Sequence, residues 1–123
     1  FSFQAERGEE LLEMGSQSQG PLTLKIGLPS MPQALAGVQF NAEQGAQAQI
    51  TMRLFHTDSE GTVSLREATA QGQVHEELVS EPGAYHVELW IVPQHFSASA
   101  GSVQDILNQE YLWVISNSIR VLP

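Results

Sequence analysis

The sequence predicts an all-β protein, an immunoglobulin-like sandwich of about seven antiparallel strands with one short helix. Three observations predict it. Short segments of alternating apolar and polar residues recur along the chain, Gly, Pro, Ser and Asn separate these segments, and long helical patterns are missing. A parallel α/β sheet would need a helix after most strands, so two packed antiparallel sheets are favoured.

The alternating segments are the predicted strands. In the second of them Leu22, Leu24 and Ile26 fall on one face, and in the third Met52 and Leu54 do the same. Because side chains alternate across a strand, these faces are expected to point into the core. The full set of predicted strands is Phe1–Ala5, Leu22–Leu28, Ala48–His56, Thr62–Glu67, Gly72–Leu78, Ala84–Val92 and Trp113–Leu122.

Turn residues mark the predicted connections. Asp58–Gly61 is typical of a hairpin loop, and Glu81–Gly83 predicts a turn just before the next strand. The clearest helical stretch is Ser102–Gln109, in which Ser102 is placed to cap the N-terminus and Asp105 follows three residues later. One or two helical turns are expected there.

Tyr85 stands at the start of a predicted strand, in the segment Pro-Gly-Ala-Tyr-His-Val of residues 82–87. The inward-facing Val87 follows two positions later. This is the placement of a tyrosine corner, in which the hydroxyl bonds back to the backbone a few residues upstream. We therefore expect Tyr85 to be structural, and its position favours the immunoglobulin-like architecture.

Composition indicates one domain, expected to span residues 1–123. The chain has 41% hydrophobic and 15% charged residues, which is the balance of an ordinary folded protein. Its 123 residues are enough for a single core. Because the sequence begins at Phe1 rather than at a methionine, we expect it to be a domain excised from a larger chain.

The charge balance excludes several classes of partner. Acidic residues outnumber basic ones 14 to 5, which gives a net charge of -9. A field of this sign repels phosphate backbones and anionic lipids, so no nucleic-acid partner is expected. No apolar run approaches the roughly 20 residues of a membrane span, so membrane insertion is not expected either. The absence of cysteine rules out disulfides, thiolate zinc sites and a cysteine nucleophile.

No motif predicts an active site. The segment His75-Glu76-Glu77 does not continue to a second histidine, as the metalloprotease helix motif would require. His56 and Asp58 lie beside a predicted hairpin loop and are candidates for a metal site. The simpler interpretation is that both side chains are exposed to solvent. Neither a Gly-x-Ser-x-Gly turn nor a phosphate-binding glycine loop is present. We therefore assign no catalytic, cofactor-binding or metal-binding residue. The histidines are His56, His75, His86 and His95.

One strand face carries side chains suited to an interface. His86, Glu88 and Trp90 share a face of the strand 84–92, and they are interpreted as a strip that packs against a neighbouring domain. The alternative is a carbohydrate- or small-ligand-binding module, in which Trp90 and Tyr111 stack on the ligand. Trp113 belongs to that platform only if it is exposed, and a core position is the expected one. A stand-alone hydrolase would need His75 or His56 to converge with carboxylates.

Three stretches resemble a known family. They are residues 1–6 followed by Met14 and Gly15, residues 82–88 (Pro-Gly-Ala-Tyr-His-Val-Glu), and residues 113–121 (Trp-Val-Ile-Ser-Asn-Ser-Ile-Arg-Val). Together they resemble the β-sandwich domain found C-terminal to the catalytic domain in some bacterial PHP-type (polymerase and histidinol phosphatase) metal-dependent phosphoesterases. The likeness extends over nearly the whole chain, although each motif is short.

The resemblance implies an accessory module that packs against an N-terminal catalytic domain of the same chain. The second motif of that family usually has arginine where His86 stands, and the third departs at Ile115, Ser118 and Arg120. The metal-binding histidines and aspartates of the family belong to its preceding domain. No catalytic residue is therefore carried over to this chain.

Overall fold

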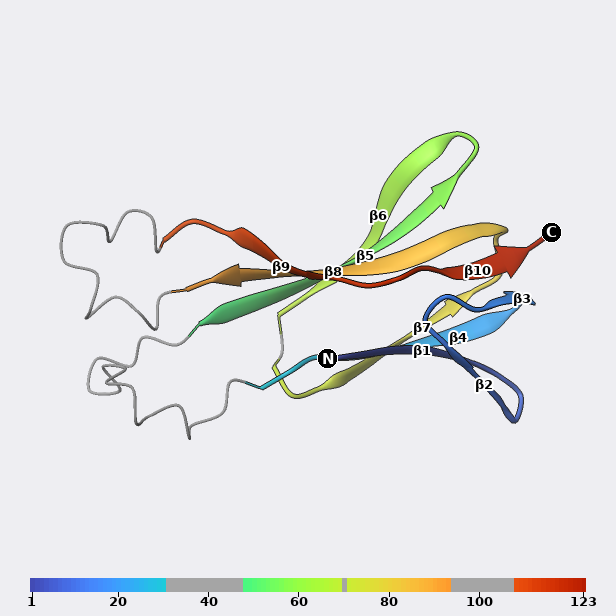
Figure 1. The fold of residues 1–123 in the computed structure, drawn as a ribbon, viewed down its shortest axis with the longest axis horizontal. Helices are drawn as coiled ribbons and strands as arrows, with labels where there is room; N and C mark the ends of the chain where they lie inside the picture. The colour runs from blue at the N-terminus through green and yellow to red at the C-terminus, as the bar shows by residue number, and fades with distance from the viewer. Residues whose placement is uncertain (31–47, 70, 94–107) are drawn as a thin grey trace.

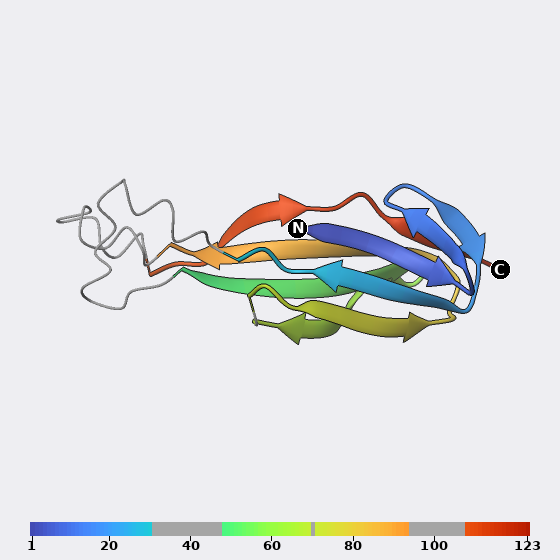
Figure 2. The ribbon, with the colours of Figure 1, turned by 90° about the horizontal axis from the view of Figure 1, so that it is seen from below.

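The computed structural model describes residues 1–30, 48–69, 71–93 and 108–123. Within these residues the chain forms only β-strands, arranged in two sheets that lie as layers (Figures 1 and 2). The predicted all-β, sandwich-like class is therefore confirmed. The described residues contain no helix. The helix predicted over Ser102–Gln109 lies outside them, except for Asn108 and Gln109, which form a turn and a bend.

The first sheet has four strands in the order β2-β1-β4-β7, and the second has six. The order in the second is β3-β10-β8-β5-β6, with β9 also paired to β8. The strands are β1 (Ser2–Arg7), β2 (Glu10–Glu13), β3 (Gln17–Gln19), β4 (Leu22–Gly27), β5 (Gln49–Asp58), β6 (Gly61–Ala68), β7 (Val74–Val79), β8 (Gly83–Val92), β9 (Tyr111–Ile115) and β10 (Ile119–Leu122).

Six of the predicted segments coincide with one strand each, and the last divides into two. The strand predicted over Trp113–Leu122 is interrupted at residues 116–118. At the break, Ser116 donates its backbone N–H to the Val87 carbonyl, while its hydroxyl accepts from the Val87 N–H at 2.9 Å. A side chain thus replaces a backbone carbonyl in the ladder, and β9 and β10 become separate strands beside β8.

Strands β2 and β3 were not predicted, and β3 corrects the expectation of purely antiparallel sheets. Both are short and polar, Glu-Leu-Leu-Glu and Gln-Ser-Gln, so they carry little alternation. After β2 the chain crosses to the other sheet, and β3 runs parallel to β10. Two backbone hydrogen bonds fix the crossing, from Gly15 N to Ser118 O at 2.9 Å and from Arg120 N to Ser16 O at 3.0 Å.

The core lies between the sheets and is built from the predicted inward faces. Leu22, Leu24 and Ile26 of β4 are fully buried, as are Met52 and Leu54 of β5. The two sheets therefore enclose a hydrophobic core of their own, which is the property that lets a domain fold independently. The other members of the core are Phe3, Ala5, Leu12, Leu28, Val79, Tyr85, Val87, Leu89, Ile119 and Val121.

Charged side chains close one open side of the sandwich, where β6 and β7 are the edge strands. Arg66 of β6 donates from Nη1 to the Glu76 carbonyl and to the Glu77 carboxylate of β7, each at 2.9 Å. The register pairs Arg66 with Leu54 and Glu77 with Leu24, so both charges lie on the inward-facing side of their strands. Inward charges of this kind prevent edge strands from pairing with another chain.

Candidate functional site

Tyr85 occupies a buried corner at the start of β8. Its hydroxyl donates to the Glu81 carbonyl at 2.7 Å, and its ring stacks on His56 with centroids 4.6 Å apart. Nε2 of His56 lies 3.0 Å from the Pro82 carbonyl. The expectation that His56 is exposed to solvent is therefore wrong, because its side chain is only 4% exposed. The reason is register, because His56 is opposite Tyr85 on the inner face of the sheet.

The same corner is expected to make the stability of the protein fall in alkali. Burial raises the pKa of the Tyr85 hydroxyl above its ordinary value of 10.0, and the carboxylates of Glu81 and Asp58 add to the effect. A raised folded-state pKa gives stability that is complete below pH 10.0 and lost as the pH rises through the folded-state pKa. We expect the unfolding free energy of the wild type to fall more steeply above pH 10 than that of Tyr85→Phe. Equal slopes in urea titrations of the two proteins would contradict this.

The outer face of the six-stranded sheet holds a connected group of side chains, here called the outer strip: Arg53 and Phe55 of β5 with His86, Glu88 and Trp90 of β8. The register places Arg53 opposite Glu88 and Phe55 opposite His86. Trp90 donates from Nε1 to the Glu88 carboxylate at 2.9 Å. The Arg53 guanidinium carbon lies 5.1 Å from the centroid of the Trp90 ring, a cation–π contact.

The rest of the strip is fixed in the same way. The His86 ring stacks on Phe55 at 5.1 Å and 13°, and its Nε2 lies 3.5 Å from the second Glu88 oxygen. Arg53 also donates to Glu110 at 2.9 Å and to Glu67 at 3.0 Å. These two carboxylates raise the pKa of the Arg53 guanidinium, and Glu110 has the larger effect. The guanidinium therefore stays charged. Every member of the strip is thus held by at least one other.

Strand β9 adds exposed apolar side chains beside the strip. Leu112 is in register with Trp90 and Ile115 with Glu88, so both lie on the outer face. Their exposed fractions are 49% and 61%, and that of Trp113 is 44%. The expectation that Trp113 fills the core is therefore wrong. The ladder shifts register at this point, and Trp113 is the extra residue of a β-bulge, a feature that re-aims side chains.

Tyr111 is not brought together with Trp90. It is in register with Ile91, the neighbour of Trp90 along β8. Because successive side chains of a strand point to opposite faces, Tyr111 lies on the other side of the sheet from Trp90. Of the residues predicted for a docking or ligand-binding face, the structure groups His86, Glu88 and Trp90 and leaves Tyr111 apart. Arg53 and Phe55 were not predicted as members of this site. Alternation along their strand places both on the outer face, but the sequence does not show that β5 pairs with β8.

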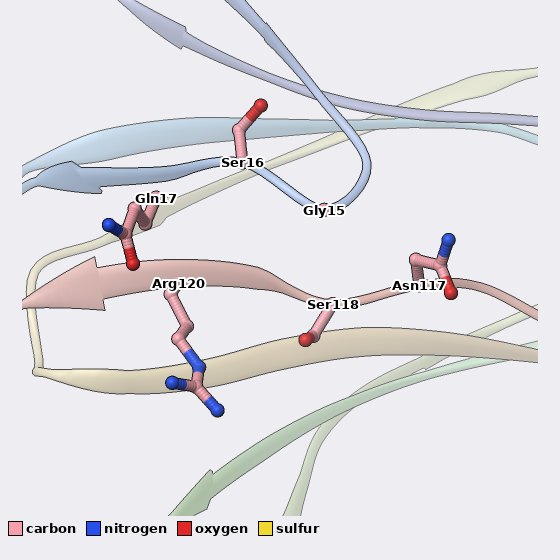
Figure 3. Close-up of a pocket in the computed structure, with 6 residues that line it drawn as sticks. All are labelled: Gly15, Ser16, Gln17, Asn117, Ser118 and Arg120. Atoms are coloured by element: carbon pink, nitrogen blue, oxygen red, sulfur yellow. The ribbon is translucent and has the colours of Figure 1, made fainter.

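A polar hollow of about 320 Å³ lies on another part of the surface of the described residues (Figure 3). Its wall residues do not converge: the Ser16 hydroxyl points away from the Ser118 hydroxyl and the Arg120 guanidinium (Figure 3). Nothing in this arrangement selects a ligand. The lining residues are Gly15, Ser16, Gln17, Asn117, Ser118 and Arg120.

The described histidines do not form a metal-binding cluster. In the described part of the chain no three His, Asp or Glu side chains are placed to hold a metal ion. Nε2 of His75 is buried without a hydrogen-bond partner there, beside Ile26 in the register. His95 lies outside the described residues. The described histidines thus belong to the corner, the outer strip and the inner side of β7.

No protein-family model, curated protein or solved structure matches the chain. Among the described residues there is also no helix long and apolar enough to span a membrane. The candidate site among the described residues is the outer strip, whose side chains are half-buried, together with the exposed apolar side chains of β9.

Proposed function

We propose that this chain is a non-catalytic accessory module that docks on a neighbouring catalytic domain through the outer strip. The aromatic side chains on one outer face carry the proposal. The four-stranded sheet presents ion pairs, with Lys25 Nζ 2.7 Å from Glu6 and 3.5 Å from Glu76, and exposed aliphatic side chains such as Leu78. The six-stranded sheet presents Trp90 and Phe55, with exposed apolar side chains of β9 beside them. Aromatic side chains of this kind are enriched at protein interfaces.

The fixed side chains of the strip support docking. An interface loses free energy when it must immobilise flexible side chains on binding. Here Trp90 and Arg53 are already held, by Glu88 and by Glu67 and Glu110 respectively. Tryptophan and arginine are also the residues most often found at the energetic centre of interfaces. The side chains of the strip therefore need little further ordering when a partner binds.

The strand order supports an immunoglobulin-like topology for the module. Taking β1, β4 and β7 as strands A, B and E gives one sheet of that fold. Taking β5, β6 and β8 as C, C′ and F, with β9 and β10 as G, gives the other sheet in the order G-F-C-C′. This assignment puts Tyr85 near the start of strand F, after the E–F corner, where a tyrosine corner belongs.

A PHP-type metal-dependent phosphoesterase domain on the N-terminal side is the partner that we propose. The motifs at residues 1–6, 82–88 and 113–121 support this choice through their resemblance to accessory domains of that family. The alternative, a carbohydrate-binding module, draws no support from the site. Arg53 lies over the Trp90 ring, and Tyr111 is on the opposite side of the sheet from Trp90.

The test begins with the reading frame that encodes this chain. A PHP-type domain on its N-terminal side supports the proposal, and a frame without any neighbouring catalytic domain overturns it. In the full polypeptide, Trp90→Ala is expected to uncouple the two domains, so that one thermal transition becomes two. The matched control is Leu78→Ala, an apolar side chain 71% exposed on the four-stranded sheet. Uncoupling by both variants, or by neither, would count against docking through the strip.

A further inference from the structure

Residues 112–115 of β9 form an uncharged stretch of sheet edge in the described part of the fold. The strand reads Tyr-Leu-Trp-Val-Ile and, among the described residues, pairs only with β8. Strand β3 covers β10 from Gln17 to Gln19 and stops there. An exposed apolar edge of this kind offers unpaired backbone groups to any extended chain that reaches it.

The remaining edges of the two sheets carry devices that prevent such pairing. Strand β2 begins and ends with glutamate, and β3 is only three residues long. Strand β7 carries two adjacent glutamates, and β6 carries Arg66 and Glu67 and a register shift against β5. Charge, shortness and irregularity are the usual means of blunting an edge. Among the described edge strands of four or more residues, only β9 lacks charge along its whole length, and its one irregularity is the bulge at Trp113.

The backbone of β9 also directs a donor to the free side. Ser116 donates its N–H to the Val87 carbonyl of β8 at 2.9 Å. Because successive N–H groups of a strand point to opposite edges, the Ile115 N–H points away from β8. We propose that this edge binds an extended basic and apolar segment of a partner protein by strand addition. The six-stranded sheet then continues into the partner.

The chemistry of the partner follows from charge. The chain carries a net charge of -9. Lysine or arginine side chains in the added strand are therefore attracted to the chain. A second copy of the chain brings the same negative charge and is repelled. The inference does not depend on docking through the outer strip, because it uses edge backbone rather than the sheet face.

The experiment titrates the chain with a blocked peptide of alternating lysine and valine, followed by the fluorescence of its two tryptophans. Binding is expected to protect the Ile115 amide from hydrogen exchange and to weaken with salt. Ile115→Pro removes that donor on the solvent side of an edge strand, a place where proline is tolerated. It is expected to weaken peptide binding about tenfold or more, while Ile115→Thr, which keeps the N–H, changes it little.

Peptide-side controls keep the result clear even if the proline variant folds poorly. A peptide with N-methylated valines should not bind, and a glutamate–valine peptide should bind much more weakly. Equal binding of the N-methylated peptide would overturn strand addition, and equal binding of the acidic peptide would overturn the basic partner. Dimerisation of the wild type that Ile115→Pro abolishes would assign the edge to a second copy instead. The variant Trp90→Ala should leave the protection of Ile115 in place, which separates this site from the docking face.

Discussion

Replacing Gly83 by alanine is expected to lower the unfolding free energy by about 3 kcal/mol, and the midpoint of thermal unfolding by roughly 10 °C. Gly83 has φ of 147°, a conformation that side chains other than hydrogen rarely adopt. A Cβ atom there would also overlap Nε2 of His56 and lie 2.7 Å from the Thr57 carbonyl oxygen. His56 is wedged between Tyr85 and Pro82, so it has little room to move.

Gly61→Ala is the matched control for Gly83→Ala. Gly61 has a similar φ of 134°, but nothing lies within 4 Å of the position of its Cβ atom. It therefore reports backbone strain alone, of about 1 to 2 kcal/mol. The excess in Gly83→Ala measures the overlap with His56 and Thr57. If urea titrations give the same loss of unfolding free energy for both variants, His56 and Thr57 can move aside at little cost and the corner is not tightly packed.

Tyr85→Ala is expected to be the most damaging single truncation of the corner, with a loss of about 4 kcal/mol. The side chain is 2% exposed, so its removal leaves a large cavity between the sheets. The stacking on His56 and the hydrogen bond to Glu81 are lost as well. A loss of this size is a large part of the stability of a small domain.

Tyr85→Phe separates these contributions. Phenylalanine keeps the ring and its stacking but lacks the hydroxyl, so a loss of about 1 kcal/mol is expected. Both variants are measured by chemical unfolding followed with circular dichroism. If Tyr85→Phe costs as much as Tyr85→Ala, the hydrogen bond to the Glu81 carbonyl, and not the packing, dominates the corner. If Tyr85→Ala costs less than 1.5 kcal/mol, the corner is not part of the cooperative core.

Local pattern was sufficient for most of the strands. Leu22, Leu24 and Ile26 alternate with polar residues, so a strand can bury only the face that carries them. In the structure β4 buries this face. The hairpin at Asp58–Gly61 was also readable, because aspartate is suited to bond its own loop. Its Oδ1 accepts from the Glu60 and Gly61 N–H groups, at 2.7 and 3.2 Å. The strands β2 and β3 were not readable, since too few of their residues face the core.

The candidate site was only partly visible for a related reason. Period-two spacing placed His86, Glu88 and Trp90 on one face without any knowledge of their neighbours. Their partners depend on which strand lies beside β8 and in what register. Arg53 is 35 positions before Glu88 in the sequence, and only the pairing of β5 with β8 makes them opposite. The exposure of Trp113 depends in the same way on a bulge in the pairing of β9 with β8.

The all-β class, the inward faces and most turns were predictable from the residues alone, because these follow from side-chain alternation and local backbone preference. The tertiary structure alone decided the parallel pairing of β3 with β10, the division of the last strand at Ser116, and the burial of His56. It also decided that β3 covers β10 and not β9. Each of these depends on contacts between residues far apart in the chain, whose register is fixed only when the two sheets pack.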